Sequence, residues 1–86
     1  MLQKQIAQSA LEVKQLATQR KAVLADLGLS KQRLKMSASL LSEGLTPRME
    51  HLVLEGEVEK LVGEAEVLRQ SIPRAEAALA EARARY

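Results

Sequence analysis

"LLSEGLTPRMEHL", residues 40–52, is the only stretch in which this 86-residue chain clearly changes direction. Gly44 suits the position just after a helix, where a residue in the left-handed conformation ends the helical bonding. Leu45 can then fold back on Leu40 and provide the hydrophobic contact that accompanies such an ending. The stretch therefore predicts the end of one long helix and a tight corner after it.

The two residues that follow suit the start of a second helix. Thr46 is an acceptable N-cap, and Pro47 fits the first helical position because the N–H that proline lacks is not needed there. We expect one helix over about 2–43, a tip at 44–46 and a second helix over about 47–85. A link this short makes the two helices run antiparallel.

Apolar residues recur at alternating spacings of four and three along the second predicted helix, up to Tyr86, which is the pattern of a coiled-coil seam. The first predicted helix repeats this pattern more loosely, with polar residues such as Arg20 at some seam positions. In a hairpin folded at Gly44, the numbers of facing seam residues add up to about 88. The seam residues that define this register are Leu16, Leu27, Leu34, Leu54, Leu61, Leu68 and Ile72.

Composition favours a helix pair over a compact globule. Hydrophobic residues make up 47% of the chain, yet it has no Phe, no Trp, no Cys and a single Tyr. Large aromatic residues normally fill compact cores, whereas Leu, Val, Ile and Ala suit the contact between helices. The predicted fold class is therefore all-α, a long antiparallel two-helix coiled-coil hairpin. Because "EARARY" stops in mid-heptad, we expect the chain to be an excerpt of a larger protein.

Two residues depart from the helical pattern. Pro73 lies inside the second helix, and because the seam keeps its phase across it, we expect a kinked continuous helix; the alternative is a second helix capped by Ser71. Arg20 lies in the seam opposite Leu68. Its stem is expected to cover apolar surface while its head reaches water or Glu64, and a functional buried charge is the alternative.

The sequence offers little chemistry. Its one histidine, His51, has no cysteine partner for a metal site and is expected at a semi-exposed seam position near the tip. Glu55, Glu57 and Glu59 point in different directions on a helix, so they do not form a catalytic carboxylate pair. The basic residues are scattered and no aromatic residue lies among them, which disfavours nucleic acid as a partner. We predict no catalytic residue, no metal, no cofactor and no enzyme.

Two features outside the seam suit neighbouring helices. Gly56 and Gly63 are either permissive surface glycines or points where an adjacent helix approaches closely. Ala10, Ala17 and Leu24 repeat every seven residues beside the seam, which predicts self-association through the first helix.

The corner and the turns after it follow a recurring pattern, with a Leu-Leu pair before the corner glycine and a Leu-x-Leu-Glu-x-Glu-Val run in the second helix. The matching residues are Leu40, Leu41, Gly44, Leu45, Arg48, Glu50, Leu52, Leu54, Glu55, Glu57 and Val58. With this run, residues 38–86 resemble the hairpin domain of haemolysin-D-type membrane fusion proteins, the periplasmic adaptors of type I secretion systems. The first helix is similar only in being a heptad helix of complementary length.

The resemblance implies a mechanical role. Such adaptors are anchored in the inner membrane, and base domains that this chain lacks join them to an ATP-driven ABC transporter. Their hairpins pack side by side into a tube whose tips meet a TolC-like outer-membrane channel. The resemblance therefore implies a periplasmic location, these two partners and side-by-side self-association. The alternative is a free-standing coiled-coil scaffold or secretion chaperone that dimerises through the same seam.

The resemblance also places docking to the channel at the tip. Related efflux adaptors dock through an Arg-x3-Leu-x6-Ser pattern, in which Leu40 matches here, while Met36 and Pro47 stand at the Arg and Ser positions. Leu45 is either an apolar contact point for the channel or only a cap for the first helix, and both can hold. The residues expected to dock the channel are Leu40, Gly44, Leu45, Thr46, Pro47, Arg48 and Glu50.

Overall fold

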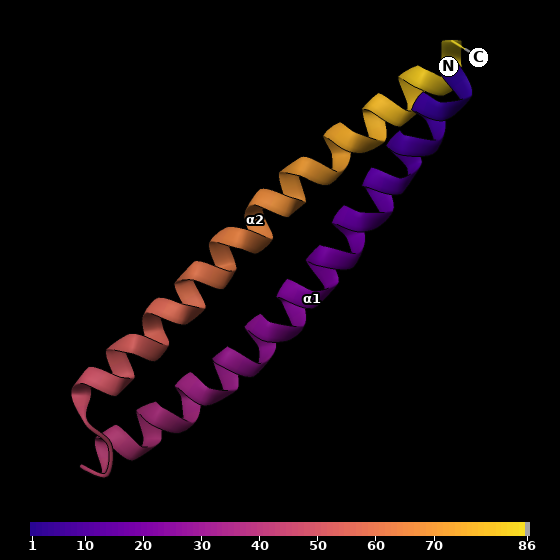
Figure 1. The fold of residues 1–86 in the computed structure, drawn as a ribbon. Helices are drawn as coiled ribbons and strands as arrows, with labels where there is room; N and C mark the ends of the chain where they lie inside the picture. The colour runs from indigo at the N-terminus through magenta and orange to yellow at the C-terminus, as the bar shows by residue number, and fades with distance from the viewer. Residues whose placement is uncertain (86) are drawn as a thin grey trace. The chain divides into compact units, whose positions relative to one another are not determined.

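In the computed structural model, which describes residues 1–85, the chain folds into two α-helices. Helix α1 spans Leu2–Ser42 and helix α2 spans Arg48–Arg85 (Figure 1). The described part of the chain contains no strand. The predicted all-α helical hairpin is confirmed. Tyr86, the last predicted seam residue, lies outside the described residues.

The two helices form two compact units, and each unit contains a stretch of α1 beside a stretch of α2. The corner unit is Val23–Ala65 and includes the connection between the helices. The terminal unit is Met1–Ala22 together with the described part of 66–86. Each unit therefore has its own segment of the seam.

The seam spacing read from the sequence matches the burial pattern of both helices. Every predicted seam position of α1 is buried or half-buried, and Ala10 is the only other residue of α1 that is not exposed. In α2 the nine described seam positions are likewise buried or half-buried, together with three polar residues. The most buried residues are Val23, Leu27, Ser30 and Ser37 in the corner unit and Leu68 and Ala75 in the terminal unit.

Helix α2 is continuous through Pro73. The hydroxyl of Ser71 donates a hydrogen bond of 2.8 Å to the carbonyl of Val67, one turn back, instead of capping a new helix. Proline removes one backbone donor, yet the flanking seam residues Ile72 and Ala75 stay half-buried and buried, so the seam continues past it. The structure therefore shows the expected continuous helix and not a second helix capped by Ser71.

Arg20 is half-buried in the seam of the terminal unit. Its Nε atom is buried and has no hydrogen-bond partner among the described residues. A buried donor without a partner loses its hydration with no compensating bond, which costs about 1–3 kcal/mol. It is therefore the buried methylene groups of the Arg20 side chain, and not its Nε, that stabilise the seam.

Candidate functional site: the corner

The end of α1 has the backbone hydrogen bonds of a Schellman motif. The N–H of Leu45 donates to the carbonyl of Leu40 at 2.8 Å, and the N–H of Gly44 donates to that of Leu41 at 3.0 Å. Gly44 has a φ of 72°, the left-handed conformation that a side chain would make costly. The prediction that Gly44 ends the first helix is confirmed.

The start of α2 differs from the prediction by one residue. The first backbone bond of the helix runs from the N–H of His51 to the carbonyl of Pro47, at 3.3 Å. Because the N-cap residue is the one whose carbonyl accepts this first bond, Pro47 is the N-cap, and the prediction that Thr46 caps the helix is wrong. The hydroxyl of Thr46 instead donates to Oε2 of Glu50 at 3.2 Å.

The connection is also longer than the tip expected at 44–46. Helix α1 ends at Ser42, and α2 begins at Arg48. The N–H groups of Glu43 and Gly44 bond to carbonyls three residues back, at 3.1 and 3.0 Å, so the last turn tightens and leaves the α-helical pattern. The connection therefore comprises residues 43–47.

The predicted docking residues differ in exposure. The side chain of Leu45 is 67% exposed, although its backbone takes part in the helix cap. The two interpretations of Leu45 are therefore compatible, because the cap uses the N–H and leaves the side chain in solvent. Arg48 is also exposed, and its side chain forms no hydrogen bond or ion pair with another described residue. Thr46 is half-buried, whereas Gly44, Pro47 and Glu50 are exposed.

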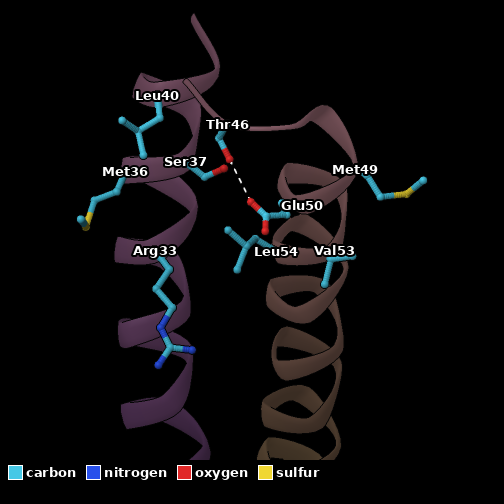
Figure 2. Close-up of a pocket in the computed structure, with 9 residues that line it drawn as sticks. All are labelled: Arg33, Met36, Ser37, Leu40, Thr46, Met49, Glu50, Val53 and Leu54. Atoms are coloured by element: carbon cyan, nitrogen blue, oxygen red, sulfur yellow. Dashed lines mark hydrogen bonds between the residues drawn. The ribbon is translucent and has the colours of Figure 1, made fainter. Parts of the chain in front are cut away.

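A groove of about 510 Å³ lies beside the corner, between α1 and α2 of the corner unit. Figure 2 shows its lining side chains and the bond between Thr46 and Glu50. Three predicted docking residues, Leu40, Thr46 and Glu50, line this groove, and the other four do not. We call it the apolar groove, and its lining residues are Arg33, Met36, Ser37, Leu40, Thr46, Met49, Glu50, Val53 and Leu54.

Most of the residues that line the apolar groove are not predicted from the sequence. Met36, Met49 and Val53 are each more than half exposed, and Met49 reaches 74%. They lie outside the seam, so a search for buried positions passes over them. The available signal was spacing, because Met36 precedes Leu40 by one helical turn and Met49 precedes Val53 by one turn.

A second groove, of about 560 Å³, also lies between the helices of the corner unit. The apolar groove is lined by residues that come just before a seam residue, and the second groove by residues that come just after one. Around the seam residue Leu34, for example, Arg33 lines the apolar groove and Lys35 lines the second groove. Positions on either side of a seam residue lie on opposite faces of a helix pair. We call this second face the charged face, after its residues Lys31, Lys35, Glu55 and Glu59.

His51 joins the two helices between these grooves. Its Nδ1 lies 3.0 Å from the hydroxyl of Ser37, and its Nε2 lies 2.9 Å from Oε1 of Glu55. The neutral tautomer with the proton on Nε2 satisfies both bonds. Ser37 is only 6% exposed, so its hydroxyl is positioned to hold α1 to α2 and is not accessible for nucleophilic attack.

The described residues offer no other chemical centre of the usual kinds. They contain no cluster of three or more His, Cys, Asp or Glu side chains that could hold a metal ion. No described helix is long and apolar enough to cross a membrane. What the corner presents is an exposed Leu45, an exposed Arg48 and the apolar groove beside them.

The two helices, the continuous seam spacing and the capped corner define the class of an α-helical hairpin. The family described as "AprE, long alpha-helical hairpin" matches residues 1–86, and the chain belongs to this family of hairpins from type I secretion membrane fusion proteins. The match includes α1, for which the sequence resemblance offered only a heptad pattern. The family is one of secretion adaptors and not of enzymes. No curated protein and no solved structure matches the chain.

Proposed function

We propose that this chain is the hairpin of a periplasmic adaptor that bridges an inner-membrane ABC transporter to a TolC-like outer-membrane channel in type I protein secretion. Membership of the AprE hairpin family is the observation that supports this role. In this proposal the full-length protein is anchored to the inner membrane, its base domains bind the transporter, and its hairpins associate side by side. The corner is the end that docks the channel.

The exposed residues of the corner support the docking role. Leu45 keeps two-thirds of its side chain in solvent on a turn held by two backbone hydrogen bonds. Apolar side chains on rigidly held turns commonly serve as contact points, because binding then orders little of the chain. Arg48, without a partner of its own, adds a cation that a carboxylate on the channel can pair with.

The structure selects the substitutions for a test. Thr46 is unsuitable, because an acidic residue there would stand beside Glu50, to which Thr46 now donates a bond. Leu45→Gln and Arg48→Glu leave the backbone bonds of the cap in place. In the full-length adaptor, we expect this double variant to reduce secretion while helicity, melting temperature and assembly with the transporter stay unchanged.

A matched control is available in the terminal unit. Val67 is 62% exposed, which is similar to the 67% of Leu45, and Arg74 is an exposed arginine on the same helix as Val67. Val67→Gln with Arg74→Glu should therefore leave secretion unchanged. Normal secretion with both corner substitutions would show that the corner does not dock the channel. A parent gene without a membrane anchor and base domains would instead favour the free-standing scaffold or chaperone.

A further inference from the structure

We propose that the apolar groove is an interface between two copies of this chain. In this pairing the copies lie face to face and parallel, related by a two-fold axis along the hairpin, so that α1 of each copy packs on α2 of the other. Each helix of the corner unit would then have two antiparallel neighbours, as in a four-helix bundle. The pairing goes beyond the proposed docking to a channel and does not require it.

Both helices of the corner unit expose apolar side chains beside the groove. Met36, Met49 and Val53 are largely exposed. Figure 2 shows that Met36 comes from α1 and Met49 from α2, each pointing away from the other helix. Leu29 precedes Met36 by one heptad and is also more than half exposed, so the apolar strip continues along α1. A strip of this kind on both helices of a pair is the surface that a second pair of helices covers in a bundle.

The two faces of the corner unit differ in polarity. If copies packed head to tail, the apolar groove of one copy would meet the charged face of the next, with Lys31, Lys35, Glu55 and Glu59. These four charges would lose water against methionine and valine side chains, and the groove offers only Arg33 and Glu50 as charged partners. An arrangement with a two-fold axis instead places each apolar groove on the other.

The charges of the two helices select among the two-fold arrangements. The α1 segment 23–42 has three basic and one acidic residue, a net charge of +2, and the α2 segment 48–65 has two basic and five acidic residues, a net charge of −3. A two-fold axis across the hairpin would stack α1 on α1 and α2 on α2, which brings like charges together. An axis along the hairpin stacks α1 on α2 of the other copy, so opposite charges meet.

Arg33 and Glu50 make the pairing self-complementary. Ser37 and His51 are bonded, so they lie at one level of the hairpin, with Glu50 next to His51 and Arg33 one turn below Ser37. In the parallel arrangement, α1 of one copy repeats these levels over α2 of the other. Arg33 of each copy then lies about one turn from Glu50 of its neighbour, within reach of the long arginine side chain.

Gly56 provides space for this approach. It follows Met49 by one heptad, and a Cβ atom added to it would meet nothing within 4 Å. Glycine is unfavourable inside a helix, and the hairpin itself does not need one here. The second copy gives a reason for it, because α1 of that copy would pass over this part of α2.

Sedimentation equilibrium of the 86-residue chain, up to millimolar concentration, tests the pairing. We expect a monomer–dimer equilibrium. Arg33→Glu should raise its dissociation constant about tenfold, because the substitution is present in both copies and so removes two equivalent ion pairs. The reversed pair, Arg33→Glu with Glu50→Arg, should restore the dimer. Lys35→Glu makes the same charge change on the opposite face and should leave the dimer intact. A strict monomer at every concentration would overturn the proposal.

Gly56→Gln provides a test that does not depend on charge. Glutamine favours the helix more than glycine does, so the variant should melt at a higher temperature as a monomer. Its longer side chain should nevertheless weaken the dimer, because it fills the space left for the second copy. A dimer as strong as that of the unchanged chain would contradict the parallel arrangement.

Disulfide trapping distinguishes the possible arrangements, because the chain has no cysteine of its own. A mixture of Met36→Cys and Val53→Cys chains should form covalent dimers, since the pairing puts α1 on α2. Dimers from Met36→Cys alone would indicate α1 on α1. Cross-linking of Met36→Cys with Glu59→Cys chains would indicate head-to-tail packing. Either of these last two results as the main product would overturn the proposal.

Discussion

The corner unit and the terminal unit share one seam spacing but place different residues in it. In the corner unit, polar side chains meet across the seam: Ser37 with His51 at 3.0 Å, and the hydroxyl of Ser30 with Oε1 of Glu57 at 3.4 Å. In the terminal unit the most buried residues are Leu68 and Ala75. The same heptad period therefore supports a contact in which polar side chains are bonded across the seam and one in which the most buried residues are apolar.

The difference suggests a division of roles between adhesion and register. Burial of leucine and alanine is favourable at many relative positions of two helices, so an apolar seam tolerates a shift. A buried hydrogen bond is lost when the helices slide, because each polar group then faces an apolar one. We therefore expect each buried residue of the terminal unit to contribute more to the free energy of unfolding than one of the corner unit. The corner unit is expected to fix the register of α1 against α2.

Shortening a buried side chain in the seam of the terminal unit should have the largest effect on stability. Leu68 is 5% exposed, so Leu68→Ala removes buried methyl groups and leaves a cavity. We expect a loss of about 2–3 kcal/mol in the free energy of unfolding, at the lower end for buried leucines because a two-helix seam can partly close. Urea unfolding followed by circular dichroism measures it. Val67→Ala, at an exposed neighbour, should change little, and equal losses for the two variants would contradict the seam assignment.

A side chain at Gly44 should have the next largest effect. Its φ of 72° is costly for any residue with a Cβ atom, so Gly44→Ala should destabilise the hairpin by about 1–2 kcal/mol. Gly56→Ala is the matched control, because Gly56 lies in regular helix with open space around it. That control should be stabilising by up to about 1 kcal/mol. The same sign for both variants in thermal melts would contradict the cap.

Loss of the Ser37 hydroxyl should have a smaller effect, confined to the corner unit. Ser37→Ala leaves Nδ1 of His51 without its partner in a mostly buried site, which should cost about 1 kcal/mol. The matched control is Ser39→Ala, since Ser39 is exposed on the same helix. Nitrogen NMR of the imidazole should show a changed Nδ1 signal only in the first variant. An unchanged signal would mean that the Ser37–His51 bond does not form in solution.

The fold was predictable because its determinants are local and repeated. Seam residues three and four apart fix the buried face of each helix, and the glycine at position 44 marks the corner. The expected sum of 88 also holds for Ser37 and His51, whose contact crosses the seam. The same register, extended to this pair of polar residues, indicates that their side chains meet.

The missed features depend on geometry that spacing does not determine. Whether Thr46 or Pro47 caps α2 depends on which carbonyl accepts the first helical bond, a difference of one residue. The apolar groove combines side chains from both helices that are exposed when each helix is considered alone, such as Met36 and Val53. The apolar period of a helix indicates only the residues that the helix buries. A surface made of exposed residues from two helices can be recognised only when both helices are in place.

Acid should have the smallest effect, through an ion pair of the terminal unit. Two bonds from Arg69, of 2.6 and 2.9 Å, and one from Gln70 lower the pKa of Glu66 from 4.5 to about 2. Because the folded pKa is lowered, the pair stabilises α2 above about pH 4.5 and is lost as the pH falls through about 2. Its effect on melting should be slight, since both groups are fully exposed and lie on one helix. Carbon NMR should show Glu66 titrating near pH 2, and closer to its ordinary value in Arg69→Met, where only the bond from Gln70 remains, while Arg74→Met changes nothing. If Arg69→Met leaves the midpoint where it was, the arginine does not hold this carboxylate in solution.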